Sequence, residues 1–185
     1  MLRRTVFGLA AYNGEIIDWN VVVQGGRELV VWGNGLTFNE VVDGGTVRVT
    51  SGPATLDIVA GVTWNKDVDF DISRPDFRQD TDRGFYGGML SVQSGLHQPF
   101  VYGLVQRDYN GNEVSNRGDV TTRFDYNSYY LGAGSTGAFT DNWLYALEFV
   151  YEGGGGLSNS IDNTGAQVTQ TDEDIQAWAL DARLD

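Results

Sequence analysis

The sequence predicts an all-β fold, an antiparallel up-and-down meander that forms part of a transmembrane β-barrel. Three observations predict it. Apolar residues alternate with small or charged ones over segments of roughly ten residues, the length of a tilted strand that crosses a bilayer. Aromatic residues stand at the ends of these segments. The connections alternate between short turns and long polar loops, an asymmetry that is typical of barrels in the bacterial outer membrane.

The connections follow this order along the whole chain. The short ones are residues 24–26, 51–53, 95–98 and 139–142. The long ones are residues 32–44, 65–83, 109–122 and 153–173. Because short and long connections alternate, all long loops fall at the same end of a meander. A soluble sheet has no need of this arrangement.

The strand at 143–152 shows the alternation most clearly. One face carries Trp143, Tyr145, Leu147, Phe149 and Tyr151, and the other carries Leu144, Ala146, Glu148, Val150 and Glu152. A period of two places these sets on opposite sides of the sheet. We predict that the first set faces lipid, together with Leu56, Ile58, Trp178 and Leu180.

Other segments repeat the pattern less regularly. Phe100, Tyr102 and Leu104 alternate with Val101, Gly103, Val105 and Arg107, and the aromatic set is again predicted to face outward. The run 129–131 breaks the phase and predicts a β-bulge. Nine strands are expected from about Ile16 onward, with one more at 5–12.

Residues 1–185 are predicted to form a single barrel domain, and the chain is expected to be about half of a larger barrel. Bacterial single-chain barrels have even strand numbers, whereas this chain ends within a strand pattern. Such a fragment would have two open edges, which are unstable in isolation.

Composition excludes several function classes. The net charge of −13 disfavours binding to nucleic acid, which needs a basic surface. The chain has no cysteine, and it has no apolar run long enough for a transmembrane helix. Its cations are arginines apart from Lys66. Arginine is favoured over lysine where bidentate pairing occurs in a confined space.

Several segments resemble the alginate-export family of outer-membrane barrels. Residues 26–35 read GRELVVWGNG and resemble that family's Gly-Arg-x-Glu-Leu-x-Tyr-Gly-Asp stretch, although the residue between Arg27 and Glu28 is missing. Residues 44–50 resemble its Asp-Gly-x-Arg-Leu strand, and 55–60, 124–127 and 143–148 are also similar. The resemblance implies passive export of an anionic, alginate-like polysaccharide through an arginine-rich lumen.

The residues predicted to line this lumen are charged and lie opposite the aromatic faces. They are Arg48, Asp57, Arg107, Arg123, Asp125, Glu148, Glu152, Asp181 and Arg183. One interpretation is a ladder of fixed charges that selects a charged permeant. The other is mutual pairing that fills and stiffens the lumen. The acids outnumber the arginines, which weakens the argument for an anionic permeant.

The sequence gives little indication of catalysis or of a cofactor. Asp67, Asp69 and Asp71 would share one face of an extended strand and form a weak calcium candidate. A zinc site is not expected, because His97 is the only histidine and cysteine is absent. Glu148 and Glu152 are too far apart along a strand for a glycosidase pair. We therefore expect no enzymatic activity and no cofactor.

The predicted function is that of a porin or export channel in the bacterial outer membrane. It would pass a polar solute or an anionic polysaccharide by passive diffusion, in contact with membrane lipid and lipopolysaccharide and without nucleic acid. The alternative is a secreted β-sandwich that binds carbohydrate. A sandwich would gather its aromatic residues in one concave patch, whereas a barrel would place them in outer belts.

Overall fold

The computed structural model describes residues 11–12, 15–16, 18–63, 82–110, 114–123, 125–140 and 142–185. Twelve strands occur in these ranges: β1 (Ala11–Tyr12), β2 (Glu15–Ile16), β3 (Trp19–Val31), β4 (Asn39–Ser51), β5 (Ala54–Thr63), β6 (Arg83–Val92), β7 (His97–Asp108), β8 (Val114–Arg117), β9 (Val120–Arg123), β10 (Tyr126–Thr140), β11 (Trp143–Leu157) and β12 (Asp172–Leu184). No helix in the described ranges is long and apolar enough to cross a membrane.

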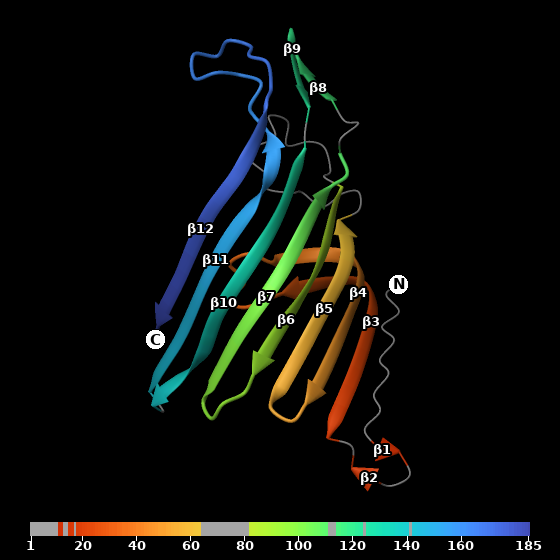
Figure 1. Ribbon diagram of the computed structural model, residues 1–185, viewed down its shortest axis with the longest axis vertical. Helices are drawn as coiled ribbons and strands as arrows, with labels where there is room; N and C mark the ends of the chain where they lie inside the picture. Colours follow the sequence, from red (N-terminus) through yellow and green to blue (C-terminus); the bar gives the residue numbers. More distant parts are fainter. Residues whose placement is uncertain are drawn as a thin grey trace.

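Eight of the strands form one open, curved sheet in the order β12-β11-β10-β7-β6-β5-β4-β3 (Figure 1). All pairings within it are antiparallel, which confirms the predicted all-β meander. The sheet has eight strands rather than nine or ten. The short turn predicted at 24–26 is absent, because β3 continues through these residues and stays paired with β4. Within the predicted long loop 109–122, β8 and β9 form a separate hairpin between β7 and β10. Among the described residues no second sheet of comparable size stacks on it, so the β-sandwich alternative is not found.

A double glycine step bends the β3–β4 hairpin. Gly25 lies opposite Gly45, and Gly26 lies opposite Gly44. Gly26 has a φ of 133°, which disfavours other residues. A Cβ at Gly44 would lie 2.2 Å from the carbonyl oxygen of Ala60. The absence of side chains lets the strands bend sharply here, and the far halves of β3 and β4 run across the other strands (Figure 1).

The connection between β3 and β4, residues 32–38, is the hairpin tip, and it lies against the concave face of the sheet. It was predicted as a longer loop, 32–44, but β4 already begins at Asn39. The ring of Phe38 packs on Phe85, with centroids 5.2 Å apart, and Trp32 packs on Phe38 at 5.5 Å. The buried apolar core formed in this way comprises Val30, Trp32, Phe38, Val42, Val59, Phe85, Phe100, Tyr102, Leu104 and Val150.

The core explains one wrong prediction. Phe100, Tyr102 and Leu104 were predicted to face outward, but they lie on the concave side, where they are 6%, 5% and 1% exposed. Their strand neighbour Val101 is 54% exposed on the convex side. The aromatic rings of β7 point inward because the hairpin tip supplies an apolar partner there.

Two further details differ from expectation. The glycine run 153–156 was interpreted as the entry to a flexible loop, but β11 continues through it to Leu157. The bulge predicted at 129–131 is absent, since β10 keeps its register with β11 there. The register shifts between Ala138 and Thr140 instead.

The convex face carries an unbroken apolar band. One row of directly opposed residues crosses all eight strands and comprises Val21, Val49, Leu56, Leu90, Val101, Ala133, Phe149 and Leu180. The strand alternation places all nine residues predicted to face outward on this side. Trp178, for example, is 74% exposed.

Candidate functional site

The concave face is the candidate site, because it carries most of the charged residues singled out in the sequence. Arg48 lies directly opposite Asp57, and that row continues through Met89 to the buried Tyr102. The next row contains Glu148 and Asp181, which are opposite each other. Strand alternation adds Glu152 and Arg183 to the same face.

Three of the predicted lumen residues do not lie there. Arg107 is opposite Gly84 and adjacent to the buried, inward Gln106, so it lies on the convex side. The error arises because the inward and outward faces of β7 are the reverse of those predicted. Arg123 ends β9 in the separate β8–β9 hairpin, outside the main sheet. Asp125 precedes β10 and lies near Arg107 instead.

The charged pairs on the concave face are internally neutralised. Arg48 donates from Nε to Asp57 Oδ1 at 2.6 Å. Arg183 donates from Nε to Asp181 Oδ1 at 3.1 Å, and its Nη2 lies 2.8 Å from Oδ2. Both arginine side chains are more than half exposed, whereas both aspartates are largely buried. Because the arginine side chains remain mostly in solvent, these ion pairs contribute little to stability.

Glu148 anchors the hairpin tip. Its side chain is fully buried, at 0% exposure. Its Oε2 accepts a hydrogen bond from the backbone amide of Asn34 at 2.6 Å, and its Oε1 accepts one from the Tyr102 hydroxyl at 2.6 Å. The Tyr102 hydroxyl also lies 2.8 Å from Thr37 Oγ1. The Glu148 carboxylate thus ties β11 to Asn34 of the tip, and the Tyr102 hydroxyl links β7 to Thr37.

The close fit at this point requires a glycine. Gly33 has a φ of +58°, and a Cβ there would lie 2.8 Å from the Glu148 carboxyl and from the Phe100 ring. The tip can therefore approach β11 only because this residue has no side chain.

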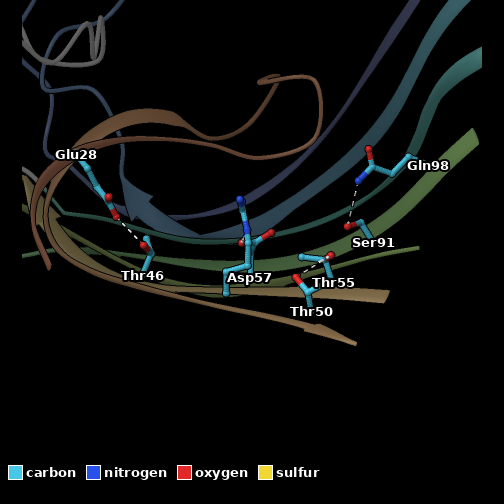
Figure 2. A network of polar contacts seen from close by, with 8 residues as sticks. Glu28, Thr46, Thr50, Thr55, Asp57, Ser91 and Gln98 are labelled. Carbon is cyan, nitrogen blue, oxygen red and sulfur yellow. Dashed lines mark hydrogen bonds and ion pairs between the residues drawn. The ribbon is translucent and has the colours of Figure 1, made fainter. Parts of the chain in front are cut away.

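A row of hydroxyl groups lies beside Asp57 (Figure 2), the residue that is paired with Arg48. Thr50, Thr55 and Ser91 are directly opposed across β4, β5 and β6. Together with Gln98 and the hairpin tip they border a cavity of about 370 Å³. Farther along the face, Thr46 donates to Glu28 Oε1 at 2.7 Å.

A second cavity, of about 630 Å³, lies near the long-loop end of β7, β10, β11 and β12. Arg107, Asp125 and Asp172 are among its lining residues. Burial, together with the nearby charges of Asp108 and Asp172, raises the pKa of the Asp125 carboxyl. Asp125 is mostly exposed, so this desolvation is partial, and the cavity shares no lining residue with the one beside the hydroxyl row.

The calcium candidate, Asp67, Asp69 and Asp71, lies outside the described residues. Within the described ranges no group of three histidine, cysteine or acidic side chains is placed to hold a metal ion. The His97 Nδ1 atom is 2.9 Å from the Tyr145 hydroxyl, so the imidazole makes an ordinary side-chain contact.

Sequence reasoning missed the neutral members of the site. Thr50, Thr55 and Ser91 alternate with apolar residues and were available as a signal, but only charged positions were considered. The sequence did not indicate that Asn34 binds Glu148, because the two residues are 114 positions apart in the chain.

No family model, curated protein or solved structure matches the chain. The functional argument therefore rests on the geometry of the two faces.

Proposed function

We propose that the sheet forms part of the wall of a β-barrel in the bacterial outer membrane, with its convex face in lipid and its concave face lining a passive conduit for polar solutes. One observation carries the proposal. The convex row through Phe149 is apolar on all eight strands. The neighbouring concave row has polar residues on six: Asn20, Thr50, Thr55, Ser91, Glu148 and Asp181.

The size of the apolar face supports a lipid contact. Soluble monomers rarely expose apolar patches larger than a few hundred Å², and larger ones are covered by a partner or a membrane. Exposed aromatic residues stand near both ends of the band, with Trp19 and Trp143 at one end and Tyr86 and Tyr129 at the other. Belts of this kind are typical of the two membrane interfaces.

The band also has the height of a bilayer. Along β11 it extends from Trp143 to Tyr151, roughly the nine to eleven residues of a membrane-crossing strand. Beyond it the same side becomes charged, with Arg27 paired to Asp43 and with Arg107. A change from apolar to charged residues at one level across several strands is expected where the headgroups begin.

The concave charges favour a polar solute without net charge over an anionic polysaccharide. Arg48 and Arg183 are each paired with an aspartate, and Glu148 adds a buried carboxylate. Export of an alginate-like polymer, which the family resemblance implies, would need arginines with unneutralised charge. Among the described strands, β3 and β12 are paired on one side only, so both edges can pair with further strands that close the wall.

Ion selectivity in planar lipid bilayers tests this proposal. The closed barrel, with the edges of β3 and β12 paired, is expected to give stepwise, ohmic conductance after reconstitution. Replacing Arg48 and Arg183 by Ala should raise the cation-to-anion permeability ratio by about twofold or more, because Asp57 and Asp181 then lose their counter-charges.

The matched control replaces Arg27 and Arg107 by Ala, two arginines on the opposite face. This variant should keep the permeability ratio of the unaltered protein. The absence of conductance steps would overturn the conduit. An equal shift in both variants would overturn the assignment of the two faces.

A further inference from the structure

We propose that the cavity bordered by the hydroxyl row and the Arg48–Asp57 pair is a binding subsite for a neutral saccharide. This inference rests on the proposed conduit and names the class of solute that it would carry. The cavity, at about 370 Å³, is within the range of small-molecule sites. It lies on the concave side, and Gly33 of the hairpin tip is one of its lining residues.

The hydroxyl groups of the row have unused hydrogen-bonding capacity. Thr50 Oγ1 and Thr55 Oγ1 are 3.5 Å apart, and Gln98 Nε2 is 3.5 Å from Ser91 Oγ. Both distances are beyond the usual range for hydrogen bonds of these types. Each hydroxyl can donate once and accept twice. Figure 2 shows these groups within the curve of the sheet, side by side on neighbouring strands.

Ser91 is the clearest case of this unused hydrogen-bonding capacity. Ser91 is only 5% exposed, and among the described residues its hydroxyl has no hydrogen-bond partner other than Gln98. A buried polar group without a short hydrogen bond is unfavourable, and native structures rarely retain one without a reason. A ligand hydroxyl in the cavity would supply the missing partner.

The ion pair determines the charge of the ligand. Arg48 uses its Nε atom for Asp57, and its side chain is 62% exposed. Its planar guanidinium can therefore donate to two adjacent hydroxyl groups of a ligand. Because Asp57 neutralises it, the pair attracts neither anions nor cations strongly. It offers donors and an acceptor to neutral hydroxyl groups.

Part of the remaining wall is apolar, although Thr136 also borders the cavity. Phe100 and Met89 border the same cavity, and Phe100 is 6% exposed. A pyranose ring has this mixed character, with hydroxyl groups around its edge and C–H groups on its faces. An apolar wall beside several convergent polar groups is the usual composition of a small-molecule site.

The test uses maltohexaose as the neutral probe and hexamannuronate as the anionic one. Calorimetric titration of the detergent-solubilised protein is expected to show binding of maltohexaose in preference to hexamannuronate. In bilayers, maltohexaose should interrupt the ion current. The variant Arg48→Gln/Asp57→Asn should weaken maltohexaose binding by about tenfold, because the charge-assisted donors are lost.

The control variant is Arg27→Gln/Asp43→Asn. It removes another directly opposed Arg–Asp pair from the other face of the sheet. In this pair Arg27 Nη2 lies 3.2 Å from Asp43 Oδ2. Its maltohexaose affinity should equal that of the unaltered protein. Equal losses in both variants, or tighter binding of hexamannuronate, would overturn the subsite. Normal conductance without maltohexaose binding would overturn the subsite and leave the conduit standing, whereas absence of conductance would overturn the conduit itself.

Discussion

Replacing Phe149 by arginine is expected to destabilise the protein in lipid by about 2–4 kcal/mol, the cost of an arginine at the bilayer midplane on the outer face of a barrel. Phe149 lies on the convex face, 48% exposed, in the row that is apolar across all eight strands. In lipid the guanidinium would lose its hydration without gaining a partner. The measurement is a denaturant titration of the protein folded into lipid vesicles.

The control for this substitution is Asn142→Arg, in the turn before β11. An arginine at this level can reach water, so its cost should be about 0–1 kcal/mol. If Phe149→Arg costs no more than Asn142→Arg, the convex face does not contact lipid.

Replacing Glu148 by alanine is expected to cost about 3 kcal/mol and to release the hairpin tip. The substitution removes the acceptor of the part-buried Asn34 amide, and a buried donor that loses its acceptor costs about 1–3 kcal/mol. The Tyr102 hydroxyl loses one of its two partners and keeps Thr37 Oγ1. Deleting the buried side chain also leaves a cavity. Trp32 is 3% exposed at the base of the tip. Its fluorescence should therefore become accessible to acrylamide in the variant.

Glu152→Ala is the matched control for this prediction. Glu152 lies on the same strand and face and also accepts a hydrogen bond from a tyrosine, Tyr126, at 2.6 Å, but it has no hydrogen bond to the tip. Its removal should leave Trp32 protected. Similar acrylamide quenching of Trp32 in Glu148→Ala and in the unaltered protein would show that Glu148 does not hold the tip.

Local alternation was sufficient to predict β11 and β5. In both strands one face is consistently apolar, so Phe149, Leu147, Leu56 and Ile58 were placed on one side without knowledge of the rest of the fold. The meander followed from the short turns, because a short connection allows only an antiparallel neighbour. These features depend on residues that are close in the sequence.

Which residues face the concave side depends on contacts between residues that are distant in the sequence. In β7 both faces are apolar, at Val101 and at Tyr102, so alternation alone could not decide which one faces inward. The answer depends on the hairpin tip, whose inward course follows from paired glycines on β3 and β4. For the same reason Arg107, on the same strand, was predicted on the concave side although it lies on the convex side. The neutral hydroxyl row was missed because threonine and serine also occur commonly on solvated strands.

The most direct test of the two-faced sheet is the quenching of single tryptophans by brominated lipid. Two proteins are needed, one retaining only Trp178 and the other only Trp32, with the remaining tryptophans replaced by phenylalanine. Trp178 is exposed on the convex face, whereas Trp32 is buried on the concave side. In vesicles, bromine on the acyl chains should strongly quench Trp178 and leave Trp32 bright. Quenching of Trp178 by aqueous acrylamide, with no effect of brominated lipid, would contradict the membrane wall.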